Sequence, residues 1–127
     1  MTIIKKINGS FDVYNAAGFQ VEGSYNPDSK GLSPLELLES SLGLCISISL
    51  QKMFERDEID VGDDEFSVKV DATKASDGPS RVEKCMVNIT LPKHLSDEYK
   101  KKLIVSAERA CTIGNTLKKG LIIHTNR

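Results

Sequence analysis

The stretch Ser33–Arg56 reads SPLELLESSLGLCISISLQKMFER and predicts one long helix around which the rest of the chain is arranged. Ser33 can cap a free backbone N–H, Pro34 fits the first helical position, and Glu36 completes a capping box. At about 100° per residue, one narrow polar stripe is made of Glu36, Glu39, Ser40, Gly43, Ser47 and Gln51. The pattern therefore predicts a central helix that is buried around most of its circumference.

Cys45 lies midway along this helix, with Ser41 and Ser49 four residues to either side on the same face. Two interpretations stay open. The cysteine is either a small buried hydrophobe with no reactivity, or a nucleophile held in an apolar wall beside a few placed hydroxyl groups. The second arrangement suits chemistry on an apolar substrate.

Composition limits the class of protein. A length of 127 residues predicts a single domain over residues 1–127. The net charge of -1 argues against nucleic acid or an anionic membrane surface as a partner. The three cysteines are an odd number without close spacing, which is typical of neither a disulfide framework nor a zinc site. We therefore expect no metal, and a reducing cytoplasm as the location.

The sequence predicts two groups of strands. Residues 2–24 alternate in polarity around a turn at Asn8-Gly9, which predicts a three-stranded meander. Residues 66–72 and 82–91 alternate in the same way and predict a hairpin. Cys85 falls on the apolar face of that hairpin, where inert core packing is expected.

The C-terminal third predicts two further helices and a last strand. Ser96 can cap a helix over residues 97–110, Cys111 follows where that helix ends or bends, and Gly120 is a natural C-terminal cap. Residues 121–123 are apolar and predict the strand. The order βββ-α-ββ-αα-β is an α+β fold with too few elements to cover the apolar central helix, so we expect an obligate homodimer.

Two segments resemble the signatures of the OsmC/Ohr family (osmotically induced and organic hydroperoxide resistance proteins). Ser33–Leu38 followed by Leu42–Cys45 resembles the first signature, in the form Pro-x-Glu-Leu-Leu that a subgroup of OsmC-like proteins carries. Ala107–Leu117 resembles the second signature. The resemblance implies an intertwined homodimer in which two long central helices are sandwiched between antiparallel sheets, with active sites at the subunit interface.

The resemblance also implies an activity, the thiol-dependent reduction of organic hydroperoxides. Cys45 would be the peroxidatic cysteine and Cys111 the resolving cysteine, and their disulfide would be reduced by an external dithiol such as a dihydrolipoyl group. No bound cofactor is implied. The substrate would be a small organic hydroperoxide, because the surroundings of Cys45 are apolar.

The chain departs from the pattern of the active peroxidases in this family. Those enzymes stabilise the thiolate with an N-terminal arginine, held by a glutamate directly after the proline. Here no arginine precedes Arg56, Leu35 occupies the glutamate position, and Thr112 stands where a proline is usual. Glu36 is one residue later and points away from Cys45, so its expected role is the capping box.

Three functions therefore remain in competition. The first is the peroxidase, the second is a non-catalytic protein that binds a small hydrophobic ligand in the dimer-interface pocket, and the third is a redox sensor. Around Cys45 the supporting candidates are Glu36, Ser41, Ser49 and Arg109. Arg109, or Arg81 or Arg127 of the partner subunit, is the candidate cation for the thiolate.

Overall fold

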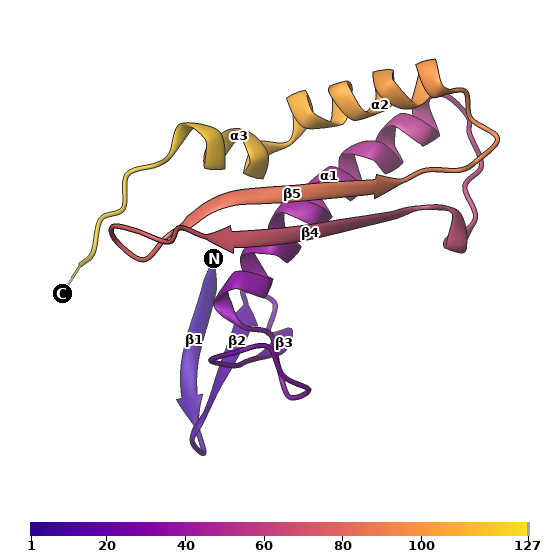
Figure 1. The fold of residues 1–127 in the computed structure, drawn as a ribbon. Helices are drawn as coiled ribbons and strands as arrows, with labels where there is room; N and C mark the ends of the chain where they lie inside the picture. Colours follow the sequence, from indigo (N-terminus) through magenta and orange to yellow (C-terminus); the bar gives the residue numbers. More distant parts are fainter. Residues whose placement is uncertain (127) are drawn as a thin grey trace. The chain divides into compact units, whose positions relative to one another are not determined.

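The computed structural model describes residues 1–126 and confirms the α+β class, with three α-helices and two antiparallel sheets. The chain forms two compact units, Met1–Glu39 and the remainder from Ser40, and the division falls inside helix α1. Among the described residues, no helix combines the length and hydrophobicity needed to cross a bilayer. The elements, labelled in Figure 1, are β1 (Thr2–Ile7), β2 (Ser10–Asn15), β3 (Gln20–Gly23), α1 (Pro34–Arg56), β4 (Ser67–Lys74), β5 (Val82–Thr90), α2 (Asp97–Ala110) and α3 (Thr112–Lys119), with a 3₁₀ turn at Asp63–Glu65.

The first unit is the expected meander, in the order β1-β2-β3 with antiparallel pairing throughout. Asn8 and Gly9 both have positive φ, 51° and 83°, which is the geometry of a tight hairpin turn whose twist matches its strands. After β3, Gly23 forms a bridge with Leu32 and the chain enters α1.

The start of α1 has the predicted capping box. The Ser33 N–H donates to Glu36 Oε1 at 2.9 Å, and the Glu36 N–H donates to Ser33 Oγ at 3.3 Å. Ser33 is buried, so this reciprocal pair satisfies polar groups that would otherwise be left without partners.

The core of the second unit lies where α1 meets α2 and the β4–β5 hairpin. The hairpin adds half-buried side chains from its inner face, including Val70 and Val87, which pair across the strands. Cys85 is half-buried opposite Ala72, as expected for core packing. The α1 members of the core recur every four residues, and the buried hydrophobic set is Leu42, Ile46, Leu50, Phe54, Leu91, Leu103, Ala107 and Cys111.

The buried face of α1 differs from the predicted one. Gly43, expected on the polar stripe, is buried, and a Cβ built there would lie 3.2 Å from Val70 Cγ2. The missing side chain is what allows α1 to approach β4 so closely. In the single chain, Leu44 and Ile48 are 62% and 48% exposed, which agrees with the expectation that one chain has too few elements to cover this apolar helix.

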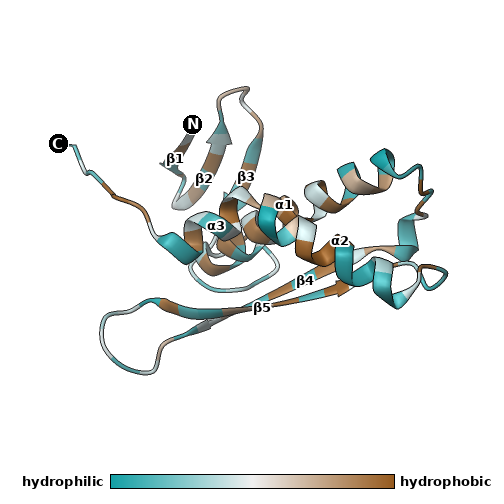
Figure 2. Ribbon diagram, turned by 90° about the horizontal axis from the view of Figure 1, so that it is seen from above, coloured by the Kyte–Doolittle hydropathy of each residue, from teal (hydrophilic) through white to brown (hydrophobic). Residues whose placement is uncertain are grey.

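The strand expected at residues 121–123 is also absent. A strand needs a hydrogen-bonded neighbour, and no described strand pairs with this segment. Leu121, Ile122 and Ile123 are 67%, 80% and 80% exposed, and the segment after α3 includes a stretch coloured as hydrophobic in Figure 2. The rest of the predicted order, βββ-α-ββ-αα, is confirmed.

Candidate active site

Cys45 and Cys111 meet in the second unit. Cys45 is half-buried on α1, and Cys111 is buried at the single residue that separates α2 from α3. Each thiol is among the groups that shift the pKa of the other, and neither cysteine is in a disulfide. The two cysteines of the predicted site therefore lie side by side although they come from distant parts of the sequence.

The bend between α2 and α3 positions Cys111. Its backbone is extended, with φ -76° and ψ 103°, so it ends one helix and begins the next. Its Sγ accepts a hydrogen bond from the Gly114 N–H at 3.2 Å, which makes Cys111 the N-cap of α3. A Cβ built on Gly114 would lie only 3.3 Å from that sulfur and 3.6 Å from Leu42 Cδ1. The first turn of α3 thus packs against α1 beside Cys45.

Backbone groups at the start of α3 also change the pKa of Cys45. The backbone N–H of Ile113 is the largest influence and lowers the pKa of the Cys45 thiol, with further lowering from the Cys111 side chain and the Thr112 N–H. Burial opposes these contributions, but the net direction of the Cys45 pKa is down. The physical cause is that the first N–H groups of a helix have no intrahelical acceptor and carry its positive dipole end, which favours a thiolate.

The pKa of Cys111 is raised, in the opposite direction to that of Cys45. Burial is the main cause that raises the pKa of Cys111, and the hydrogen bond to Cys45 raises it further, while the Gly114 N–H lowers it in part. A pair whose pKa values are pushed apart has different roles for its two members. Of the two cysteines, Cys45 is therefore the one that ionises first as the pH rises.

Of the other predicted site residues, two serines lie near Cys45 on α1, and Glu36 is engaged in the helix cap. Ser41 and Ser49 are half-buried on α1, four residues to either side of Cys45. Glu36 is in the first unit and is engaged in the capping box. None of these three is among the groups that shift the Cys45 pKa within residues 1–126.

Two of the candidate cations, Arg109 and Arg81, lie at exposed positions in the single chain. Arg109 is exposed in the last turn of α2, and its carbonyl oxygen accepts a hydrogen bond from Asn115 Nδ2 at 3.1 Å. Arg81 is exposed and its guanidinium donates to a carbonyl oxygen of the β4–β5 turn, that of Asp77, at 2.8 Å. Arg127 lies outside the described residues. Over residues 1–126, no cation is among the groups that shift the Cys45 pKa.

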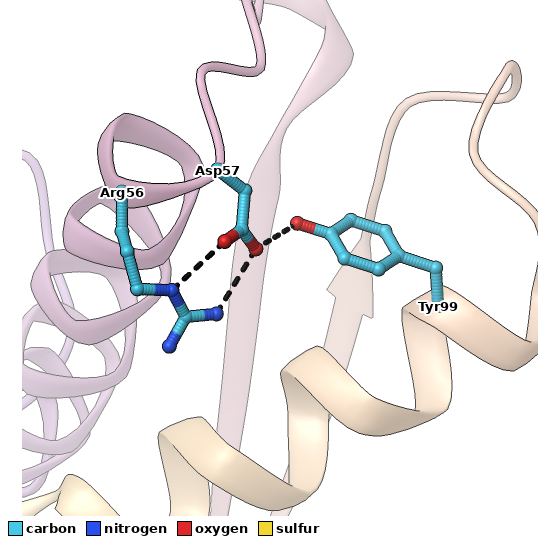
Figure 3. Close-up of polar contacts among 3 residues, drawn as sticks. All are labelled: Arg56, Asp57 and Tyr99. Atoms are coloured by element: carbon cyan, nitrogen blue, oxygen red, sulfur yellow. Dashed lines mark hydrogen bonds and ion pairs between the residues drawn. The ribbon is translucent and has the colours of Figure 1, made fainter.

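A second polar cluster joins the end of α1 to α2 (Figure 3). The Arg56 guanidinium donates two hydrogen bonds to the Asp57 carboxylate, at 2.9 and 3.0 Å, and the Tyr99 hydroxyl donates to the same carboxylate. These bonds, from Arg56 first and Tyr99 second, lower the pKa of Asp57 to about 2. Burial and then Asp57 raise the pKa of Tyr99 to about 12.

An open pocket of about 470 Å³ lies beside this cluster. Its lining includes Arg56 at the end of α1 and the α2 residues Tyr99, Leu103, Val105 and Arg109. Among the described residues, no group of three or more His, Cys, Asp or Glu side chains is arranged to hold a metal ion.

Sequence reasoning missed that the backbone amides of Ile113 and Thr112 lower the pKa of Cys45. A cysteine at a break between two helical patterns, followed three residues later by Gly114, is the signal that was available. It marks Cys111 as a helix N-cap, and residues after an N-cap carry unpaired N–H groups.

Comparison with known proteins gives one consistent result. The sequence model of the family described as OsmC-like protein matches residues 27–126. An OsmC-like protein from Mycoplasma pneumoniae has a similar structure, with a TM-score of 0.80, 18% identity, and coverage of 93% of this chain and 86% of that one. Comparison with curated protein sequences finds no match.

Two similar structures carry functional names. The organic hydroperoxide resistance protein OsmC from Legionella pneumophila has a TM-score of 0.66 at 17% identity, over 93% of this chain and 89% of that one. The organic hydroperoxide resistance protein OhrB of Bacillus subtilis has a TM-score of 0.65 at 17% identity, over 93% and 90%. At these identities the likeness establishes the fold.

Proposed function

The chain belongs to the OsmC-like protein family, and from that premise we propose that it is a thiol-dependent peroxidase for small organic hydroperoxides. The observation that supports the proposal is the contact between Cys45 and Cys111, whose pKa values move in opposite directions. A lowered pKa gives the nucleophile, and a raised pKa keeps the neighbouring thiol protonated.

In the first step the Cys45 thiolate attacks an oxygen of the hydroperoxide. The O–O bond breaks, the alcohol leaves after taking up one proton, and Cys45 becomes a sulfenic acid. The Cys111 thiol is close enough to shift the pKa of Cys45, and it is the thiol that we expect to react with that product.

In the second step the Cys111 sulfur attacks the sulfenic sulfur of Cys45. A disulfide forms, and the sulfenic oxygen leaves as water with the proton of the Cys111 thiol. An external dithiol then reduces the disulfide by two exchange steps and is itself oxidised to a disulfide, which returns both cysteines to the thiol form. No bound cofactor is needed.

The surroundings of Cys45 support an organic rather than an inorganic peroxide. The neighbouring turns of α1 carry Leu44 and Ile48, whose side chains are exposed in the single chain. Such apolar surface favours an alkyl or acyl hydroperoxide over the fully polar hydrogen peroxide. We include the homodimer in the proposal, because a second copy would cover this apolar face of α1.

The opposed pKa shifts favour a reacting pair over a non-catalytic ligand-binding pocket, since cysteines that only line a pocket need no thiolate. A redox sensor would share the oxidation of Cys45 and the formation of the disulfide. It would differ only in the last step, the rapid reduction of the disulfide by an external dithiol. Turnover with an external dithiol separates these two functions, because a sensor accumulates as the disulfide.

The experiment is oxidation of the reduced protein by one equivalent of cumene hydroperoxide, followed by intact mass and a free-thiol count. The native chain is expected to lose two thiols to a Cys45–Cys111 disulfide. Cys111→Ser is expected to gain the mass of one oxygen at Cys45, and Cys45→Ser is expected to stay reduced.

Cys85→Ser is the matched control, because Cys85 lies on the β4–β5 hairpin and has no part in the proposed reaction. It should oxidise like the native chain. A Cys45 that stays reduced under excess hydroperoxide would overturn the peroxidase and leave ligand binding as the function to test. Hydrogen peroxide run in parallel reports the preference for organic substrates.

A further inference from the structure

We propose that the open pocket beside the end of α1 is a second binding site, for a small organic phosphate. The pocket has a volume of about 470 Å³, and its lining comes from Arg56 and from α2, both within the second unit. None of the described residues that line it is a cysteine. The inference therefore goes beyond the proposed peroxidase and does not depend on it.

The helical spacing of α2 gathers polar and cationic side chains along this pocket. Lys102, Ser106 and Arg109 follow one another at intervals of four and three residues, which places them on successive turns of one helix face. Lys101 and Val105, four residues apart, form the neighbouring row. All five residues line the pocket, so one side of the helix forms a continuous wall.

The lining is positively charged, although the whole chain has a net charge of -1. Among the described residues that line the pocket there is no Asp or Glu, and the cations are Arg56, Lys101, Lys102 and Arg109. Lys102 has only an exposed partner, Glu98, at 3.8 Å. Within residues 1–126, Lys101 and Arg109 form no ion pair. Because these like charges repel one another, a bound anion would relieve the repulsion.

Arg56 is held in a fixed orientation for such an anion. Its guanidinium uses Nε and Nη2 for the two bonds to Asp57, and the Tyr99 hydroxyl donates to the same carboxylate from α2. The third guanidinium nitrogen, Nη1, points away from Asp57 (Figure 3) and keeps both of its N–H donors. Such donors suit the oxygens of a phosphate group.

The size and the apolar part of the lining favour a phosphate that carries an organic group. Leu103 and Val105 add apolar surface between the cations. From Lys102 to Arg109 the helix rises about 10 Å, which is longer than one phosphate group. A phosphate monoester carries about -1.5 to -2 charges near neutral pH and three acceptor oxygens, so it matches several cations better than a single carboxylate does. The volume also lies in the range of about 300–1,000 Å³ that is typical of small-molecule sites.

The test is isothermal titration calorimetry of the reduced native chain with phenyl phosphate, at constant ionic strength. Inorganic phosphate, benzoate and benzyl alcohol are titrated in parallel, because they carry the phosphate alone, a carboxylate with the ring, and the ring without a charge. Phenyl phosphate is expected to bind at least about fivefold more tightly than each of these three compounds.

Lys101→Gln and Lys100→Gln are the matched variants, because both remove one positive charge from neighbouring positions of α2 and only Lys101 lines the pocket. Lys101→Gln is expected to weaken the binding of phenyl phosphate about fivefold, and Arg109→Gln about tenfold, since arginine can donate two hydrogen bonds to one phosphate. Lys100→Gln should change the affinity by less than about twofold. Thermal unfolding of each variant checks that the fold is retained.

Three results would overturn the inference. The first is the absence of phenyl phosphate binding at concentrations up to about 10 mM. The second is an equal loss of affinity in Lys100→Gln and Lys101→Gln, because binding would then follow the overall charge of the helix. The third is benzoate that binds as tightly as phenyl phosphate, because the pocket would then not recognise phosphate.

These measurements use no peroxide, so the site and the peroxidase stand or fall separately. Phenyl phosphate binding that depends on Lys101 supports the site even if cumene hydroperoxide leaves Cys45 reduced. If the cysteine pair reacts with the hydroperoxide and phenyl phosphate does not bind, only the phosphate site is overturned.

Discussion

The Sγ atom of Cys111 accepts a hydrogen bond from the backbone N–H of Gly114 at 3.2 Å. The same side chain is among the groups that lower the pKa of Cys45. One sulfur therefore caps α3 and faces the proposed peroxidatic thiol, so the stability of that helix and the chemistry of the site depend on a single side chain.

Replacing Cys111 is the most direct test of this double role. Cys111→Ala removes the acceptor for the Gly114 N–H and should destabilise the protein by about 1 kcal/mol relative to Cys111→Ser, whose hydroxyl is a strong N-cap. Denaturant unfolding of both variants under reducing conditions measures the difference.

Cys85→Ala and Cys85→Ser provide the matched pair of controls, because Cys85 lies on a strand and caps no helix. Cys85→Ser should not be more stable than Cys85→Ala by a comparable free energy of unfolding. If Cys111→Ala and Cys111→Ser unfold at the same denaturant concentration, the capping bond contributes nothing to stability.

The contact between Asp57 and Tyr99 predicts a pH-dependent stability. The pKa of Asp57 is lowered to about 2 from an ordinary value of 3.8, by Arg56 first and Tyr99 second. A carboxyl whose folded pKa is depressed stabilises the fold above its unfolded pKa, and this contribution is lost as the pH falls toward the folded pKa. Asp57→Asn should therefore be less stable than the native chain above about pH 4, with the difference shrinking toward pH 2.

Thermal unfolding at several pH values between 2 and 7 tests this expectation. Asp60→Asn is the control, since Asp60 is an exposed aspartate that lies three residues further along the chain. Tyr99→Phe should show part of the same loss, because it removes one of the hydrogen bonds to the carboxylate. A constant difference between Asp57→Asn and the native chain over this range would contradict the linkage.

Local sequence signals predicted most of the fold. Ser96 was expected to cap a helix over residues 97–110, and the structure has α2 at Asp97–Ala110, with the Tyr99 N–H donating to Ser96 Oγ at 3.2 Å. Gly120 was expected as a C-cap and has the positive φ, 80°, that favours glycine there. Caps and turns depend on neighbours within a few residues, which is why sequence alone finds them.

What the sequence did not predict depends on contacts between distant segments. Gly43 falls on the polar stripe of a helical wheel, yet it is buried. The cause is the close approach of β4, whose Val70 side chain leaves no room for a Cβ at this position. The amides of Thr112 and Ile113 carry no side-chain signature at all. The pairing of Cys45 with Cys111 was expected only through the family resemblance, since spacing alone does not bring two helices together.

The close approach at Gly43 predicts a strong packing effect. A Cβ there would lie 3.2 Å from Val70 Cγ2 and 3.9 Å from Val68 Cγ1, so Gly43→Val would force α1 and β4 apart. We expect a destabilisation of about 1–3 kcal/mol, typical of overpacking, despite the better helix propensity of valine.

Ser40→Val is the control for Gly43→Val, because Ser40 is an exposed position on the same helix. It should change the free energy of unfolding by less than about 0.5 kcal/mol. Chemical denaturation measures both variants. A Gly43→Val protein as stable as Ser40→Val would mean that the helix and strand are not as close as described.

The apolar face of α1 predicts the outcome of a test for the homodimer. Leu44 is 62% exposed in the single chain, and a two-fold dimer would place it against the second copy, where each introduced charge appears twice. Leu44→Glu should therefore weaken dimerisation by more than about tenfold, because a carboxylate loses its hydration when the face is buried. Sedimentation velocity over a range of concentrations measures the dissociation constant.

Met86→Glu is the matched control, because Met86 is an apolar residue with similar exposure, 51%, on the face of β5 that is turned away from α1. It should leave the dimer intact. If Leu44→Glu and Met86→Glu weaken association equally, the face of α1 is not the interface. A native chain that stays monomeric at every concentration would remove the dimer from the proposal, and the exposed leucine would then need a different apolar partner.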